Sequence, residues 1–286
     1  MMKISTRKEM SGYIFLSPWL IGSVFLLFVP MIYSLWLSFA RIDDITNLKT
    51  AFVGLDNYKR AFLTDVDFLY SLKKIISHEV IIMPLILIFS LIIAIMISRN
   101  IKMRGMFRVI FFLPVVLGTG NVMQQLLNQG VDSLSIQDVT RTLLSPQIQE
   151  YIGAGATKVV SVFLGTITTV LWRSGVQIII FLAGIQKIPN SLYESARVDS
   201  ATEWEMFWKI TLPMLAPILL LNIVYTIIAS FAERSPMVEY LLYIGFNKGE
   251  FEYSAAMGWS YFVFILAIIG IAFLIMKPFV KNVTDN

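Results

Sequence analysis

The stretch IQKIPNSLYESARVDSATEWEMFWKITLPMLAP, at Ile185–Pro217, places about thirty polar, acidic and aromatic residues between two apolar runs. Prolines at positions 189, 213 and 217 interrupt it. A connection that only joined two membrane helices would need far fewer residues and less local structure. This segment therefore indicates a membrane protein with a structured loop outside the bilayer, built to contact something there.

The rest of the chain is apolar enough to cross a membrane repeatedly. Of its 286 residues, 57% are hydrophobic, whereas soluble domains are about 45–50% apolar. A membrane helix needs about 20 mostly apolar residues, and continuous rather than alternating runs disfavour transmembrane strands. We expect an all-α, polytopic membrane protein, with residues 1–286 forming a single transmembrane domain of six helices. The six runs are approximately 13–39, 75–97, 109–127, 159–184, 214–232 and 257–280.

The distribution of Lys and Arg predicts the orientation, since cytoplasmic loops carry an excess of both. The short link Ser98–Arg108 has four cations and no acid. It should be cytoplasmic, which places both termini and the loop 185–213 in the cytoplasm as well. The first run is nearly twice as long as the 7–15 residues, roughly, of a signal-peptide core, so we interpret it as an uncleaved anchor. The expected location is the cell membrane of a bacterium or archaeon.

The residue types that most catalytic sites require are scarce. The chain has no cysteine and one histidine, His78. It contains no G-x-x-x-x-G-K-[ST] pattern for binding nucleotide phosphates. We expect no catalytic site, no metal site and no cofactor. The net charge of +4 needs no nucleic-acid partner, because cations beside lipid headgroups account for it.

Two capping boxes are predicted inside the loop. Ser191 with Glu194, and Ser200 with Glu203, both fit S-x-x-E, in which each side chain satisfies a free amide at a helix start. Helices of about 191–199 and 201–210 follow from them. Such a pair with its Trp residues also fits a segment lying in the headgroup layer. The acids argue against that alternative, because they are unfavourable beside anionic lipid and suit a protein partner better.

Five stretches of the sequence resemble a known family, and they occur in the same order as in that family. The loop holds ESARVDSA at Glu194–Ala201 and ITLP at Ile210–Pro213, and it resembles the EAA loop of binding-protein-dependent ABC importer permeases. GYIFLSPWLIG at Gly12–Gly22, FVGLDNYKRAF at Phe52–Phe62 and MRGMFRVIFFLP at Met103–Pro114 resemble the carbohydrate branch, the maltose and glycerol-phosphate type. The resemblance covers nearly the whole chain and implies the transmembrane domain of a type I ABC importer.

The resemblance also implies partners and a mechanism. A second permease, expected to be a different chain, completes the pathway, and two ATP-binding subunits dock beneath it. An extracytoplasmic solute-binding protein delivers a carbohydrate, expected to be an oligosaccharide, and lipid surrounds the spans. Ser200 stands where the family has glycine, and we expect Ser200 to cap the next helix instead. The loop residues implied to dock the ATPase are Glu194, Ser195, Ala196, Asp199, Ser200, Ala201 and Glu203.

Polar residues inside the spans are candidates for the solute pathway, because their burial in lipid is costly. Arg173 falls near the middle of the predicted fourth span, and we expect no acid of this chain near it. Gln177 and Asn222 have an alternative role as hydrogen-bonding contacts between helices. Aromatic faces suit the apolar patches of sugars, while amide and guanidinium groups suit hydroxyls. The pathway candidates are Trp172, Arg173, Gln177, Asn222 and Tyr225.

Other functions remain open from the sequence. One half of a secondary transporter, or a permease for a solute other than a sugar, would share the apolar spans. Secondary transporters usually couple through buried acids, and Glu79 is predicted within a turn of the outer edge of its span. A membrane enzyme would need a constellation of acid, base and nucleophile that the sequence does not offer.

Overall fold

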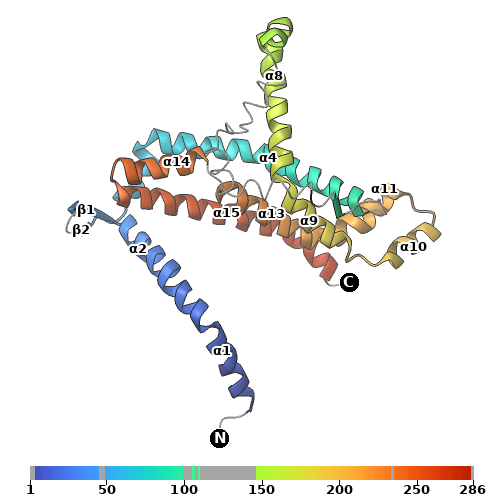
Figure 1. The fold of residues 1–286 in the computed structure, drawn as a ribbon, viewed down its shortest axis with the longest axis horizontal. Coiled ribbons are helices and arrows are strands. Elements are labelled where there is room, and N and C mark those ends of the chain that lie inside the picture. The colour runs from blue at the N-terminus through green and yellow to red at the C-terminus, as the bar shows by residue number, and fades with distance from the viewer. Residues whose placement is uncertain are drawn as a thin grey trace. The chain divides into compact units, whose positions relative to one another are not determined.

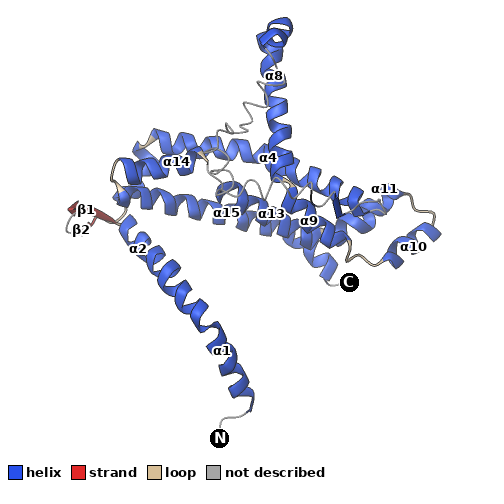
Figure 2. Cartoon of the chain, viewed as in Figure 1, coloured by secondary structure: helices blue, strands red, loops and turns tan. Residues whose placement is uncertain are grey.

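A computed structural model describes residues 4–44, 49–98, 105–106, 109, 146–232 and 235–284. Helices dominate this part of the chain (Figures 1 and 2). The chain divides into two units, Met1–Ile76 with Glu233–Leu266, and Ser77–Ala232 with Ala267–Asn286. Two long helices, α4 (Val66–Ser98) and α15 (Phe251–Thr284), contribute to both units.

Among the residues that the structure describes, four helices are long and apolar enough to cross a membrane. They are Phe15–Ser38, Val66–Ser98, Gly155–Arg173 and Phe251–Lys281. A fifth candidate is the pair Glu203–Met214 and Ala216–Phe231, which is bent by 66°. The predicted third span, 109–127, lies outside the described residues apart from Val109.

The predicted fourth span is broken in two. It forms the end of α8 (Pro146–Arg173) and all of α9 (Gly175–Ile185), with the buried Ser174 between them. The Ser174 hydroxyl donates to the carbonyl of Leu171 at 3.1 Å, and the Ser90 hydroxyl donates to the Ser174 carbonyl at 3.4 Å. Serine hydroxyls that bond back to the preceding turn often bend helices, so the sequence count of apolar residues alone missed this break.

The first unit begins with a continuous helical stretch. α1 (Ile4–Ser23) and α2 (Val29–Ser38) are joined by the π-helical segment η1 (Val24–Phe28). An antiparallel hairpin follows, in which β1 (Ala40–Asp44) pairs with β2 (Lys49–Phe52). The all-α expectation omitted this hairpin, which stands red in Figure 2.

Side chains of the FVGLDNYKRAF stretch fasten the hairpin to α2. The stretch forms α3 (Asp56–Lys59) and the π-helical segment η2 (Arg60–Thr64). The Asn57 amide donates to the carbonyls of Ser38 at 3.0 Å and Ala40 at 2.9 Å. The Tyr58 hydroxyl lies 2.7 Å from the hydroxyl of Ser38. The Asn57 bonds satisfy one carbonyl at the end of α2 and one at the start of β1, and the Tyr58 contact joins two side chains.

Asp65 joins two parts of the first unit that are distant in sequence. α14 (Pro236–Leu242) and the π-helical η4 (Tyr243–Asn247) precede α15. Asp65 accepts hydrogen bonds from the hydroxyls of Tyr240 at 2.8 Å and Tyr253 at 2.6 Å. Arg60 covers the ring of Tyr253 at 3.9 Å and pairs with Glu250 at 2.5 Å. This network links the segment before α4 to α14 and the start of α15.

The electrostatics of this network favour a charged Asp65. Partial burial raises the pKa of Asp65, but hydrogen bonds from Tyr253, the Phe68 amide and Tyr240 outweigh burial, so the pKa lies below its usual range. Burial and the bond to Asp65 raise the pKa of the Tyr240 hydroxyl. The two groups therefore meet as carboxylate and neutral phenol.

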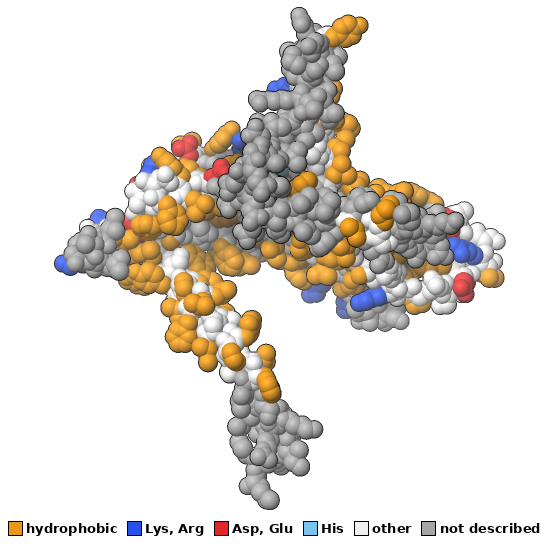
Figure 3. Space-filling view, viewed as in Figure 1, with side chains coloured by type: hydrophobic (Ala, Val, Ile, Leu, Met, Phe, Trp, Pro, Cys, Tyr) orange, Lys and Arg blue, Asp and Glu red, His pale blue; other side chains and the backbone are white. Residues whose placement is uncertain are grey.

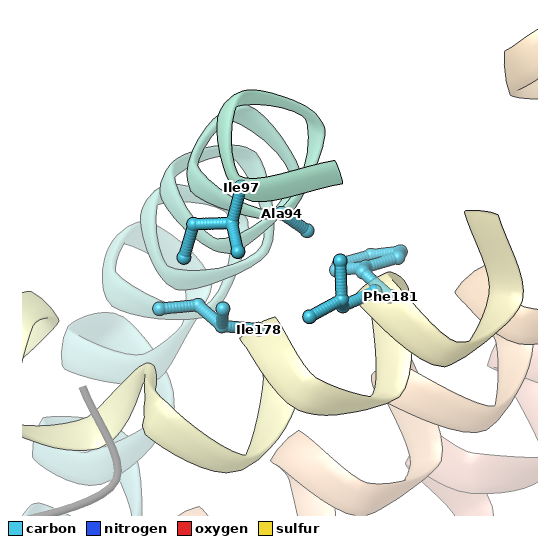
Figure 4. Close-up of a cluster of buried hydrophobic side chains, with 5 residues drawn as sticks. Ala94, Ile97, Ile178 and Phe181 are labelled. Atoms are coloured by element: carbon cyan, nitrogen blue, oxygen red, sulfur yellow. The ribbon is translucent and has the colours of Figure 1, made fainter. Parts of the chain in front are cut away.

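The second unit packs the end of α4 against α9. Figure 4 shows Ala94 and Ile97 of α4 facing Ile178 and Phe181 of α9. On the other side, α9 approaches α13 (Ala216–Ala232) closely at Gly184. A Cβ atom there would lie 2.8 Å from the Ile218 side chain, so only glycine fits this crossing without a shift.

Candidate functional site

The polar segment between α9 and α13 holds two short helices. α10 (Asn190–Val198) and α11 (Glu203–Met206) are followed by the π-helical η3 (Phe207–Thr211) and by α12 (Leu212–Met214). Charged side chains gather at the α10–α11 end of this unit (Figure 3). The predicted docking residues lie on the surface, with Ala196 and Ala201 half-buried and the others exposed. The exposed ones are Glu194, Ser195, Asp199, Ser200 and Glu203.

Neither predicted capping box forms as written. α10 begins at Asn190, directly after Pro189, and its cap residue makes no side-chain hydrogen bond. The second helix is capped by Thr202 rather than Ser200. The Thr202 hydroxyl accepts from the Glu205 amide at 3.3 Å, and the Glu205 carboxylate accepts from the Thr202 amide at 2.9 Å. A T-x-x-E box competes with the overlapping S-x-x-E pattern, and the chain turn at Ser200 decides between them.

Ser200 itself adopts a left-handed conformation, with φ of 59°. Its amide donates to the Arg197 carbonyl at 3.1 Å, and the Ala201 amide donates to the Ala196 carbonyl at 2.9 Å. This pair of bonds is a Schellman motif, which ends a helix by satisfying its last carbonyls. The expectation that Ser200 replaces the family glycine by capping the next helix is therefore wrong. Ser200 keeps the positive φ that glycine adopts most easily.

The segment is tied to the helices beneath it by polar contacts. The Tyr193 hydroxyl lies 2.9 Å from the Thr211 hydroxyl, joining α10 to the end of η3. Arg197 and Glu203 pair at 3.3 Å on the exposed side. A cavity of about 560 Å³ lies under the segment and is lined in part by Ser98 at the end of α4. The two short helices are thus connected to the core through a few side chains rather than by a broad apolar interface.

Arg173 has an acidic partner inside the same chain. Its guanidinium nitrogens lie 3.1 and 3.5 Å from the two carboxylate oxygens of Glu79, and one of them also donates to the hydroxyl of Ser230. The Arg173 and Glu79 side chains are 12% and 7% exposed. The expectation that no acid of this chain lies near Arg173 is wrong. Glu79 lies on α4, which begins at Val66, ahead of the predicted apolar run of 75–97.

His78 lies next to this ion pair. Its Nδ1 is 3.3 Å from the Glu79 carboxylate, and its side chain is 55% exposed. Neither Glu79 nor Ser230 was among the pathway candidates, and Glu79 was considered only as an acid near the outer edge of its span. The signal that points to them is chemical: a buried arginine needs a buried acid, and Glu79 is the acid nearest the middle of an apolar helix.

Gln177 and Asn222 lie between α9 and α13, both buried. The Gln177 amide donates to the Thr226 hydroxyl at 3.1 Å, and the Asn222 amide donates to the Gln177 carbonyl at 3.4 Å. Within the described part of the chain, the side-chain oxygens of Gln177 and Asn222 have no hydrogen-bond partner. This arrangement matches the interhelical role that was the alternative for these two residues. Trp172 and Tyr225 are half-buried.

Together, the long apolar helices define a multi-pass helical membrane protein, and an exposed polar helix pair and a buried ion pair are its main polar features. The family described as "Binding-protein-dependent transport system inner membrane component" matches residues 24–284, so the chain belongs to that family. This confirms the resemblance seen in the sequence.

Curated relatives and solved structures agree with this family. The chain is 32% identical to a probable ABC transporter permease protein, YesP, of Bacillus subtilis, over 95% of this chain and 91% of the relative. It is 28% identical to the trehalose/maltose transport system permease protein MalF of Thermococcus litoralis, over 78% and 74%. A bacterial ABC transporter involved in the import of alginate has a similar fold, with a TM-score of 0.65 at 20% identity, covering 96% of this chain and 97% of that one.

Proposed function

We propose that this chain is the permease subunit of an ABC importer that moves a carbohydrate, expected to be an oligosaccharide, into the cell. Relatives named for trehalose/maltose and for arabinooligosaccharides support the solute class. In this proposal residues 1–286 form one transmembrane domain of six spans with both termini in the cytoplasm. Two separate subunits hydrolyse ATP, a second permease completes the pathway, and an extracytoplasmic binding protein delivers the solute.

The observation that carries the proposal is the exposed, acidic α10–α11 segment. Val198 is 85% exposed and Trp204 is 69% exposed, and Glu194 and Asp199 lie close to them in sequence. An apolar centre with a polar rim is the usual make-up of a protein interface. Acids beside anionic lipid are unfavourable, which argues against a segment lying in the headgroup layer. We assign this surface to the ATP-binding subunit.

We propose that the solute passes Arg173, Trp172 and Tyr225. Arg173 is bonded to Glu79 and Ser230, so a solute hydroxyl would have to replace one of these partners in order to bind the guanidinium. Gln177 and Asn222 are buried between α9 and α13, and they would reach the solute only if these helices separated during transport. Their oxygens without partners are acceptors that such a movement would expose.

Cysteine labelling tests the docking and the orientation together, because the chain has no cysteine of its own. Ser195→Cys and Val198→Cys place thiols on the exposed face of α10, and Leu63→Cys, at an 80% exposed side chain of η2, is the matched control. A membrane-impermeant maleimide should label α10 only from the cytoplasmic side, and less when the ATP-binding subunit is present. Leu63→Cys should label from outside, with or without that subunit. Labelling of α10 from outside, or without regard to the ATPase, contradicts the proposal.

One observation favours the alternative of a secondary transporter: Glu79 is a buried acid within a long apolar helix. Its carboxylate is already paired with the Arg173 guanidinium at 3.1 Å. Uptake into vesicles distinguishes the two functions. An ABC importer should lose uptake when ATP is removed and keep it when the proton gradient is collapsed, whereas the reverse result supports the secondary transporter.

A further inference from the structure

The cavity of about 560 Å³ beneath the α10–α11 segment lies between that segment and the helices that carry it. Ser98 ends α4 and Gln186 follows α9, whereas Asn190 begins α10. α10 and α11 extend beyond the end of α9 (Figure 1). Two parts of the unit that few side chains connect therefore face the same space.

The cavity is open on one side and has buried walls. Ile188, Met206 and Thr211 are buried, whereas Gln186 and Asn190 are exposed. Sites for small molecules have volumes of about 300–1,000 Å³. A small ligand can therefore enter past the two amides and come to lie against the buried side chains.

The polar groups of the lining suit a neutral ligand with hydroxyl groups. The amides of Gln186 and Asn190 can each donate and accept a hydrogen bond, as a hydroxyl does. Arg197 and Glu203 are the charged residues among those described in the lining, and they pair with each other at 3.3 Å. Their charges sum to zero, so an ionic ligand gains no net attraction from the lining.

Two half-buried aromatic rings, of Tyr193 and Phe207, complete the site. The Thr211 hydroxyl donates to the Met206 carbonyl at 3.4 Å, so Tyr193 is the donor in its 2.9 Å contact with Thr211. The Tyr193 oxygen can then accept a further bond. Aromatic faces suit the apolar patches of sugars, whereas an acyl chain in the same place would cover the amides without bonding to them.

We propose that this cavity binds a small neutral saccharide, which ties α10 to the ends of α4 and α9. A ligand that contacts both parts stabilises the arrangement in which it binds. The bound saccharide would therefore restrain the segment and lower ATP hydrolysis by the assembled importer. That restraint rests on the proposed function, in which the segment docks the ATP-binding subunit, but binding in the cavity does not. A saccharide released inside the cell would thus slow the importer that delivers it.

Substitutions can fill the cavity or remove one of its polar groups. Ser98→Phe places a ring in the cavity from the end of α4. Met96→Phe is its matched control, because Met96 is 54% exposed on the same helix and does not line the cavity. Asn190→Ala removes one amide from the lining. Ser191→Ala is the control for that change, since Ser191 is the exposed neighbour outside the lining.

A thiol at the mouth of the cavity measures binding directly. Gln186→Cys in this cysteine-free chain is labelled with a maleimide in nanodiscs that hold both permeases and the ATP-binding subunits, without the binding protein. The probes are maltose, trehalose and glucose, and glucose 6-phosphate is the charged comparison. We expect at least one neutral sugar to slow labelling severalfold, and the phosphate to have less effect than glucose.

The variants locate that protection. Added to the reporter, Ser98→Phe should abolish the protection, while Met96→Phe should leave it unchanged. Asn190→Ala should raise the sugar concentration needed for protection roughly fivefold, which corresponds to one lost hydrogen bond. Ser191→Ala should leave that concentration unchanged. In the same complex without the reporter, the protecting sugar should lower ATP hydrolysis, and Ser98→Phe should remove this inhibition.

Four results would overturn the inference. They are no protection by any neutral sugar, equal protection with Ser98→Phe, stronger protection by glucose 6-phosphate than by glucose, and protection by the ATP-binding subunits without sugar. The last would mean that a segment of the ATP-binding subunit occupies the cavity. Protection with unchanged ATP hydrolysis would refute the restraint of α10. A complex that hydrolyses no ATP contradicts the proposed function instead, and the labelling result still decides whether the cavity binds a saccharide.

Discussion

Ser200→Gly should stabilise the α10–α11 turn. Ser200 is the only residue other than glycine with positive φ in the described part of the chain. A left-handed conformation costs an L-residue about 1–2 kcal/mol, and glycine avoids this cost. Glycine loses more freedom on folding, about 0.5–1 kcal/mol. The difference leaves a net gain of about 0.5–1 kcal/mol for the folded turn.

Hydrogen exchange at the amides of residues 200 and 201 measures this gain, because both amides donate in the Schellman motif. The gain corresponds to exchange roughly two to five times slower. Ser195→Gly is the matched control, since the same change inside α10 should cost about 0.5 kcal/mol and speed exchange. If Ser200→Gly speeds exchange as Ser195→Gly does, the left-handed strain assigned to Ser200 is refuted.

Four further changes test the core, the ion pair, the Asp65 network and the docking surface. Gly184→Ala places a Cβ 2.8 Å from Ile218, so it should cost about 1–3 kcal/mol and lower the unfolding temperature; an unchanged temperature counts against the close crossing. Arg173→Leu leaves Glu79 buried without its cation and should cost about 3–5 kcal/mol. Adding Glu79→Leu should recover much of that loss, and a double variant no more stable than the single one disproves the pairing. The pKa of Asp65 is lowered in the folded protein, so the stability that its carboxylate contributes is complete above the usual carboxyl pKa. That contribution is lost as the pH falls through the lowered pKa. Asp65→Asn should therefore flatten the acid side of the stability profile, and an unaltered profile rejects the network's role. Glu194→Lys should abolish uptake with normal amounts of protein in the membrane, whereas normal uptake excludes Glu194 from docking.

The helical spans were largely visible in the sequence because a membrane helix needs only a sufficient apolar length. The starts of α4 and α15 were not, since polar residues such as Asp67 and Glu252 extend these helices beyond their apolar runs. The β1–β2 hairpin was missed because it is short and depends on the Asn57 amide, which comes after it in the chain. Long-range hydrogen bonds of this kind leave no local pattern.

The sequence likewise predicted part of the candidate site, and the structure decided the rest. The acids of the loop and the existence of two short helices followed from local residue types, but the choice between two overlapping capping patterns did not. The left-handed turn at Ser200 ends α10 one residue earlier than predicted and passes the cap to Thr202. Local patterns name the residues able to cap, and the path of the chain selects among them.

By itself the sequence determined that this chain crosses the membrane, which family it resembles and where a polar segment leaves the bilayer, because composition, spacing and motif are local properties. Only the tertiary structure decided which partner neutralises Arg173, since Glu79 and Ser230 are 94 and 57 residues away in the chain. It also decided that Gln177 and Asn222 lie against each other between α9 and α13. Hydrogen bonds and ion pairs between helices offset the cost of burying polar groups, and helix packing decides which residues make those contacts.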